Sequence, residues 1–389
     1  MLLVIQSIIV YGLIIWVMTY WGQVAYKSQY PKGFGIIDRL TNKSVSPWEI
    51  FSKPYFIIPI FIFCLFASVR YKVGVDCESY KEIFYDIGKY GESRRESIEP
   101  AYVFLSKLVY GLTGHHYLMM YILAFLQIGT YYIALRKDRY ALVFLGLVLF
   151  LTGEYWSWMN GIRQNIAACA FVAIIPLITQ KKYVSTMCVI FMAMSVHQSA
   201  LILLPLSLLA FFLRKNILNK YIQIGILFVS LIMMNKFNGI LSNISYLAEH
   251  AGYGERSITA YTELEETSRT FGFRMILLYI VHSIVIWFSP NLSSYINKQT
   301  FNIWYNLYFI GICLTVLFYN NFTIMRILYY CIIFTPVIIS TLLYYLYNKK
   351  EYQIFFYIIA FLLLTRTLYN FYTVTADLMN ESILYKFDL

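Results

Sequence analysis

The sequence is poor in charged residues. Asp, Glu, Lys and Arg make up 13% of its 389 residues, whereas soluble domains contain about 25%. Hydrophobic residues make up 60%. Apolar runs of about 20 residues recur along the chain, and each is long enough to cross a hydrocarbon core of about 30 Å. These features exclude an ordinary soluble domain and predict an all-α, polytopic membrane protein.

Cysteine clusters and targeting signals are also missing. The six cysteines are scattered, with no CxxC pair and no His/Cys cluster at ligand spacing, so we predict neither disulfides nor a metal site. We also expect no cofactor. The amino terminus lacks a basic n-region, so we expect the first apolar run to remain as a helix. No internal repeat or low-complexity tract is visible, and we expect a single integral membrane domain over residues 1–389.

The apolar runs predict about 12 transmembrane helices. Short basic segments separate several of them, and by the positive-inside rule these face the cytoplasm, which places both termini outside. Two long polar segments, 70–115 and 236–272, then form outer loops. The net charge of +11 fits this orientation and an attraction to anionic lipid, so no nucleic-acid partner is expected. The predicted spans are 2–20, 54–69, 116–134, 140–153, 162–179, 183–197, 198–213, 221–235, 273–290, 301–319, 323–346 and 352–371.

Two segments carry finer predictions. Residues 183–212 could form one helix of about 45 Å, too long for a modestly tilted span, or two short helices that meet outside at His197. We prefer two helices, because this keeps the basic segment 214–220 in the cytoplasm. Residues 100–114 have helical periodicity and could lie along the membrane surface.

Polar and ionisable side chains gather at the outer ends of the predicted spans. Each arginine alone is better explained as a snorkelling anchor, and Asp76 and Glu99 could be solvated loop charges. Five arginines at one depth, however, favour a shared cavity that holds an anionic group such as a lipid-linked diphosphate. The predicted substrate-binding residues are Arg70, Tyr80, Arg163, Gln164, Arg274, Arg326 and Arg366. The predicted catalytic residues, any of which could be the general base, are His197, Asp76 and Glu99.

Several short motifs resemble those of EpsG-like proteins of bacterial exopolysaccharide and capsule assembly, which are related to Wzy-type (O-antigen) polymerases. They appear in family order along most of the chain. Cys77 departs from the pattern, which favours Ser or Thr there. The motifs are "RYKVGVDCESYKEIF" (70–84), "EPAYVFLSKLV" (99–109), "NGIRQNIAACAF" (160–171), "SVHQSALILLPL" (195–206) and "MRILYY" (325–330).

The resemblance implies a helical membrane fold like that of GT-C glycosyltransferases. It implies a metal-independent polymerase that transfers a growing glycan from undecaprenyl diphosphate to the terminal sugar of a lipid-linked repeat unit. The site would face outward from the bacterial cytoplasmic membrane. Expected partners are the lipid-linked repeat units, membrane lipid, a chain-length regulator and other polysaccharide-assembly proteins.

Three other functions use similar residues. A flippase of lipid-linked oligosaccharide would place cations in a cavity, but such transporters usually show related halves. A membrane O-acyltransferase would need an intramembrane histidine with access to the cytosol, whereas His197 is predicted to face outward. A ligase that transfers the glycan to another acceptor differs from the polymerase only in that acceptor.

Overall fold

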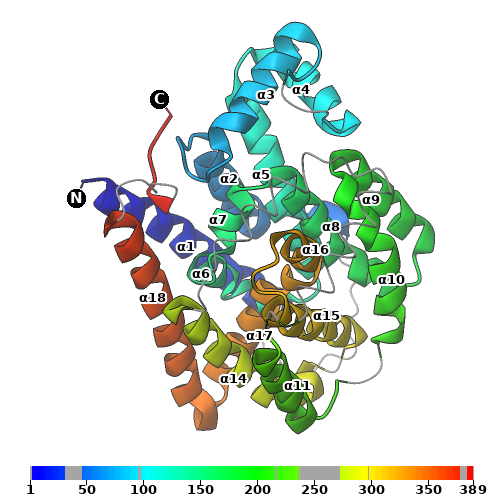
Figure 1. The fold of residues 1–389 in the computed structure, drawn as a ribbon, viewed down its shortest axis with the longest axis vertical. Coiled ribbons are helices and arrows are strands. Elements are labelled where there is room, and N and C mark those ends of the chain that lie inside the picture. The colour runs from blue at the N-terminus through cyan, green and yellow to red at the C-terminus, as the bar shows by residue number, and fades with distance from the viewer. Residues whose placement is uncertain are drawn as a thin grey trace. The chain divides into compact units, whose positions relative to one another are not determined.

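In the computed structural model the chain is helical. The structure describes residues 2–30, 46–94, 98–214, 217–234, 236, 272–296, 298–376 and 383–388. Among these residues the only β pairing is an antiparallel bridge between Arg70 and Phe387. The chain forms two compact units, one of Met1–Phe211 with Pro336–Leu389 and one of Phe212–Thr335. Figure 1 shows the helices of both units. That the chain forms a single membrane domain stays a prediction.

The first unit contains most of the helices. Its packing centres on α5, which contacts both α2 and α8 extensively, while α1 packs against α2 and α6. The helices of this unit are α1 (Leu2–Gln29), α2 (Pro54–Ser68), α3 (Cys77–Tyr90), α4 (Pro100–Thr113), α5 (His116–Leu135), α6 (Leu145–Leu151), α7 (Glu154–Met159), α8 (Ile162–Thr179), α9 (Tyr183–Val196), α10 (Leu203–Phe212), α17 (Thr335–Asn348) and α18 (Gln353–Ala376).

The prediction of 12 transmembrane helices is wrong. In the described part of the chain, seven helices are long and apolar enough to cross a membrane: Leu3–Gln29, His116–Leu135, Ile162–Thr179, Phe273–Ile296, Gln299–Leu317, Ile324–Asn348 and Lys350–Thr373. The other five predicted spans form helices of 7–15 residues. At a rise of 1.5 Å per residue, even 15 residues reach only about 23 Å.

Local sequence explains where these shorter helices begin and end. Helix α2 begins at Pro54, after Lys53 in an extended conformation. Helix α6 follows a 3-10 turn and ends at Leu151, just before Gly153, which adopts a left-handed conformation. Hydropathy averaged over a window does not detect such interruptions, so apolar runs overstate the number of spanning helices.

The helical parts of two finer predictions are confirmed, while their placement at the outer membrane surface stays a prediction. Residues 183–212 form two helices, α9 and α10, and the break lies at His197, whose backbone is extended (φ −157°, ψ 128°). Residues 100–113 form α4. By contrast, most of the predicted second outer loop, residues 237–271, lies outside the described part of the chain.

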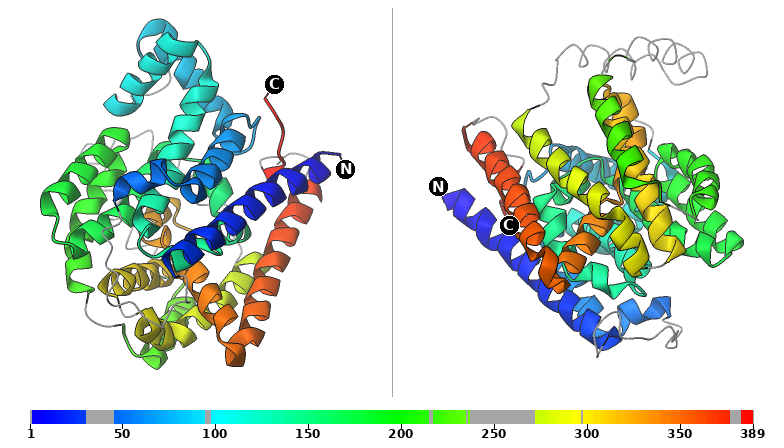
Figure 2. Two further views of the ribbon diagram at one scale, coloured as in Figure 1. Left: turned by 180° about the vertical axis from the view of Figure 1, so that it is seen from behind. Right: turned by 90° about the horizontal axis from the view of Figure 1, so that it is seen from below.

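The predicted first outer loop contains two packed helices. Helices α3 and α4 pack against each other and against α5 through buried side chains that include Phe84, Tyr102 and Val109. Gly88 permits the close approach, because an added Cβ would lie only 2.3 Å from the ring of Tyr110. Figure 2 shows the two helices from behind, in blue and cyan. The packing fixes the amino-terminal ends of both helices, where Asp76 and Glu99 lie.

The second unit contains α11 (Lys220–Ile232), α14 (Phe273–Ile296), α15 (Gln299–Leu317) and α16 (Phe322–Ile332). Some of the polar side chains between its helices are paired with one another. The hydroxyl of Tyr305 donates to Gln223 Oε1 at 2.5 Å, and His282 Nδ1 lies 2.6 Å from the hydroxyl of Tyr308. The interior is therefore held by hydrogen bonds as well as by apolar contacts.

Candidate functional site

Three of the predicted site residues meet in the first unit. Oε1 of Glu99 lies 2.7 Å from His197 Nδ1, and Oε2 of the same carboxylate forms an ion pair with Nη1 of Arg163. The side chains of Glu99 and Arg163 are 9% and 12% exposed, whereas that of His197 is 27% exposed. Glu99 is therefore bracketed by two nitrogen donors, and His197 is the most accessible of the three.

These contacts keep Glu99 ionised. Burial alone would raise the pKa of Glu99, but the hydrogen bond from His197 and the charge of Arg163 outweigh burial and lower the pKa to about 2. A carboxylate with so low a pKa and with both oxygens engaged is a weak base. In this geometry Glu99 is suited to holding His197 and Arg163 in place rather than to removing a proton.

Asp76 positions the start of α8, and with it Arg163. Its Oδ2 accepts the backbone N–H of Gly161 at 2.7 Å, immediately before the first residue of α8, Ile162. Gly161 has φ +51°, a left-handed conformation that glycine adopts without strain. Asn160 completes the turn, since its Oδ1 lies 3.4 Å from the backbone nitrogen of Asp76. Asp76 thus connects the start of α3 to the helix that carries Arg163.

Two tyrosines flank the guanidinium of Arg163. The rings of Tyr80 and Tyr102 have their centroids 6.0 Å and 5.8 Å from its central carbon, within reach of a cation–π interaction. The hydroxyl of Tyr80 also lies 3.4 Å from the backbone nitrogen of Arg163. Burial raises the pKa of Tyr80, so its phenol stays neutral. These contacts fix the direction of the arginine side chain.

Arg70 lies beneath the loop that leads to Asp76. It is 3% exposed. Its Nε donates to the carbonyl of Val73 at 3.1 Å, and its Nη1 donates to the carbonyl of Ala67. Its Nη2 is buried, with no hydrogen-bond partner among the described residues. Arg70 therefore braces the backbone of residues 67–73.

The segment 383–388 holds the same loop from its other side. The backbone of Tyr71 donates to the carbonyl of Lys386 at 2.8 Å, and that of Asp388 donates to the carbonyl of Val69 at 2.9 Å. The side chain of Asp388 binds Lys81 at 2.8 Å and His116 at 3.0 Å. A chain segment distant in sequence thus fixes the loop between α2 and α3.

The remaining predicted residues make other contacts or belong to the second unit. Nη1 of Arg366, in α18, donates to the carbonyl of Leu151 at 3.2 Å. Gln164 follows Arg163 and is half-buried. Arg274 and Arg326 belong to the second unit, in α14 and α16, and both are exposed. The structure thus brings together Asp76, Tyr80, Glu99, Arg163 and His197.

A family comparison supports the resemblance seen in the sequence. The model of the EpsG family matches residues 53–387, which include every residue of the site described above. The chain belongs to the EpsG family. This family is linked to exopolysaccharide synthesis, and the long apolar helices indicate a multi-pass membrane protein. Comparison with curated proteins and with solved structures finds no match.

Sequence reasoning missed two contributors to the site of this EpsG protein. Tyr102 flanks Arg163, and Asn160 forms the turn that Asp76 closes. The Asn-Gly pair at 160–161 was a usable signal, because this dipeptide favours tight turns. Tyr102 gave no comparable signal, since its contact with Arg163 depends on how α4 packs. Among the described residues, no group of three His, Cys, Asp or Glu side chains could hold a metal ion.

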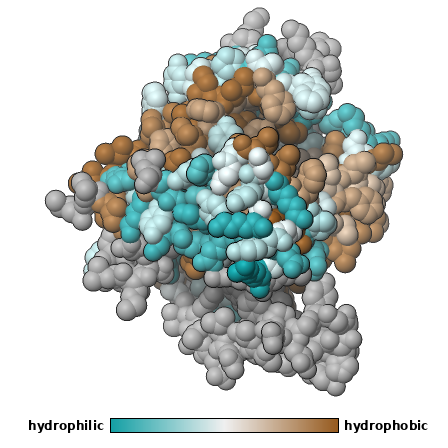
Figure 3. Space-filling model, turned by 90° about the horizontal axis from the view of Figure 1, so that it is seen from above, coloured by the Kyte–Doolittle hydropathy of each residue, from teal (hydrophilic) through white to brown (hydrophobic). Residues whose placement is uncertain are grey.

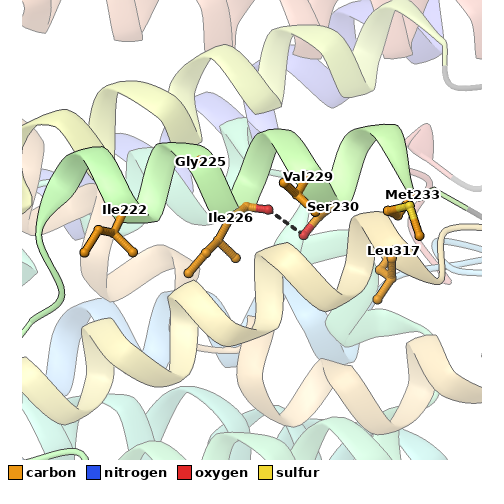
Figure 4. Close-up of a pocket in the computed structure, with 7 residues that line it drawn as sticks. All are labelled: Ile222, Gly225, Ile226, Val229, Ser230, Met233 and Leu317. Carbon is orange, nitrogen blue, oxygen red and sulfur yellow. Dashed lines mark hydrogen bonds between the residues drawn. The ribbon is translucent and has the colours of Figure 1, made fainter.

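A shallow groove of about 480 Å³ in the second unit of the EpsG protein is almost wholly apolar (Figure 4). The hydroxyl of Ser230 donates to the carbonyl of Ile226 within its own helix at 2.9 Å. The groove therefore suits hydrocarbon rather than sugar or phosphate. It is lined by Ile222, Gly225, Ile226, Val229, Ser230, Met233 and Leu317.

Proposed function

We propose that this EpsG protein is a polysaccharide polymerase of the outer face of the bacterial cytoplasmic membrane. It transfers a growing glycan from undecaprenyl diphosphate to the terminal sugar of a second lipid-linked repeat unit. The observation that carries the proposal is the arrangement of Glu99 between Arg163 and His197. This arrangement supplies a base and a phosphate-binding cation from three predicted site residues.

His197 is the proposed general base. If its Nδ1–H donates to Glu99, the lone pair of Nε2 can accept a proton from the sugar hydroxyl. Glu99 fixes that tautomer and stabilises the imidazolium that forms, in the way a carboxylate orients histidine in other acid–base sites. A pKa of about 2 keeps Glu99 anionic throughout the reaction.

The reaction breaks one bond and forms one bond. The acceptor oxygen attacks the anomeric carbon of the donor sugar, and the bond from that carbon to the diphosphate oxygen breaks. The diphosphate departs with the electron pair, and the hydroxyl proton passes to Nε2 of His197. Arg163 stabilises the charge that develops on the leaving diphosphate, because a planar guanidinium can bind an anion while it contacts Glu99.

The test is made in two steps. In cells that lack the gene, we expect lipid-linked single units to accumulate and the polymer ladder to disappear from gels of surface polysaccharide. Loss of every outward-facing unit would instead indicate a flippase. A normal ladder that no longer joins its final acceptor would indicate a ligase.

The second step uses purified protein in liposomes that contain lipid-linked repeat units. We expect His197→Ala to lower the polymerisation rate by about 10²–10⁴-fold, as for loss of a general base, while binding of the substrate is retained. Tyr183→Phe is a control that changes an exposed side chain outside the site. Wild-type rates in the His197→Ala protein would refute the assignment of the base.

A further inference from the structure

Helices α3 and α4 differ in the polarity of their exposed faces. On α4, Phe104, Leu108 and Leu112 are 69%, 48% and 70% exposed. They follow one another at intervals of four residues and so lie in one stripe along the helix. The opposite face of α4, with Tyr102 and Val109, is buried in the apolar cluster that α4 shares with α3 and α5. We call the three exposed side chains the α4 stripe.

Helix α3 exposes charge instead. Glu82 and Lys89 are exposed, and Asp86 is half-buried. The two helices therefore expose one polar face, on α3, and one apolar face, on α4. The view from the end at which α3 and α4 lie in Figure 1 shows hydrophilic areas beside hydrophobic ones (Figure 3). An apolar stripe next to a polar face is typical of a surface that contacts membrane or another protein.

The connection of α4 to α5 favours a contact with the membrane. Helix α4 ends at Thr113 with Gly114 as its cap, and only His115 separates this cap from α5. Helix α5 is one of the candidate spans. The carboxyl end of α4 therefore lies at the start of this candidate span.

Lys107 is compatible with this position. It is exposed and lies next to Leu108 in the stripe. The long alkyl stem of lysine can rest on apolar surface while its ammonium group reaches the phosphate layer. Lysine in the polar border of an apolar helix face also favours anionic lipid.

We propose that α4 lies in the lipid–water interface, with the α4 stripe among the lipids of the leaflet that α5 enters and with α3 on the water side. The partner of this surface is the bilayer itself. Glu99 precedes the first residue of α4, so the interface also sets the depth of the carboxylate that binds Arg163 and His197. Under the proposed function, this is the depth of a lipid-linked diphosphate.

The test places an environment-sensitive fluorophore on single cysteines in the full-length protein. The sites are Phe104→Cys and Leu112→Cys on α4, with Glu82→Cys and Lys89→Cys on α3 as matched controls. The exposed native cysteine, Cys188, is replaced by serine in all four. Each protein is reconstituted in nanodiscs of phosphatidylethanolamine and phosphatidylglycerol that contain nitroxide-labelled lipid.

We expect blue-shifted emission at both α4 sites and severalfold stronger quenching by lipid nitroxide than at the α3 sites. Nitroxide near the headgroup should quench more than nitroxide near the end of the acyl chain. Equal quenching on both helices would overturn the proposal. Blue-shifted emission without lipid quenching would also overturn it, because the stripe would then be covered by protein, such as a second copy.

A variant tests the role of the stripe. Leu108→Glu places a charge in it without touching the buried face of α4, and we expect it to reduce lipid quenching at position 112 at least twofold. Leu108→Met is the matched control and should leave quenching unchanged. None of these measurements uses polymerase activity, so failure of the proposed function would not alter their result.

Discussion

Asp76 and Gly161 are 85 positions apart in the sequence, yet Oδ2 of Asp76 accepts the backbone N–H of Gly161 at 2.7 Å. This bond joins the amino-terminal end of α3 to the amino-terminal end of α8. Arg163 is two residues further along the chain. The direction of its guanidinium therefore depends on a carboxylate that need not touch the substrate.

The first prediction separates these two roles of Asp76. Asp76→Asn retains an oxygen that can accept from Gly161, whereas Asp76→Ala removes it. We expect Asp76→Ala to lower the free energy of unfolding by about 1–3 kcal/mol and to reduce polymer yield strongly, while Asp76→Asn retains much of both. Thermal unfolding in detergent and gels of polymer length measure the two effects. A stable Asp76→Asn protein without activity would show instead that the charge takes part in the chemistry.

The second prediction concerns the close approach of the loop before α3 to the segment before α8. Gly74 has φ +89°, and a Cβ there would lie 2.8 Å from the carbonyl oxygen of Met159. We expect Gly74→Ala to destabilise the protein through both left-handed strain, about 1–2 kcal/mol, and this clash. Gly114→Ala is the matched control, because Gly114 has φ +68° with no atom within 4 Å of an added Cβ. Equal melting temperatures for the two variants would refute the close approach.

The third prediction follows from the lowered pKa of Glu99. Its folded-state pKa is about 2 against an ordinary value of 4.5. The ionised carboxylate therefore stabilises the fold fully above the ordinary value, and this contribution is lost as the pH falls toward 2. We expect Glu99→Gln to cost about 2–4 kcal/mol at neutral pH, because Arg163 loses its anionic partner.

The pH dependence is the specific test of this third prediction. The difference in unfolding free energy between wild type and Glu99→Gln should shrink as the pH is lowered from 5 to about 3. Melting temperatures recorded in detergent over this range would measure it. A difference that does not change with pH would show that ionisation of Glu99 contributes little to stability.

The fourth prediction concerns Arg163. Lysine can still pair with Glu99, so we expect Arg163→Lys to insert and fold like wild type. Lysine lacks the planar fork that binds phosphate through two bonds. We expect a loss of about 2–4 kcal/mol of transition-state stabilisation, which leaves mostly single repeat units on surface-polysaccharide gels. Full-length polymer from a well-expressed Arg163→Lys protein would indicate that Arg163 only anchors its helix.

The fifth prediction concerns Asp388, which binds Lys81 and His116. Burial lowers the pKa of Lys81, but the bond to Asp388 more than offsets this and leaves the pKa raised. We expect Asp388→Ala to cost about 1–2 kcal/mol of stability, since the pair is partly exposed. Asp388→Asn should cost less because it retains an acceptor. Hydrogen exchange should report faster exchange at Tyr71 in Asp388→Ala, and unchanged exchange would contradict the proposed bracing of the loop.

The sequence by itself determined the class of the protein, because composition and apolar run length depend only on which residues are present. It also placed Glu99, Arg163 and His197 near helix ends, and the family comparison confirmed the resemblance that these motifs carry. Hydropathy did not determine how many helices span the membrane. An apolar run interrupted near Gly153 has nearly the same average hydropathy as an unbroken one, although it forms only short helices.

Only the tertiary structure decided what each carboxylate contacts. On sequence, His197, Asp76 and Glu99 were all candidates for the base, because their spacing says nothing about which side chains meet. The packing of α3 and α4 directs Glu99 to His197, 98 positions away, and Asp76 to the backbone of Gly161. Helical periodicity fixes the face on which a residue lies, but contacts between helices depend on how those faces pack. For this reason the sequence indicated Glu99, Arg163 and His197 as candidates but did not indicate the contacts between them.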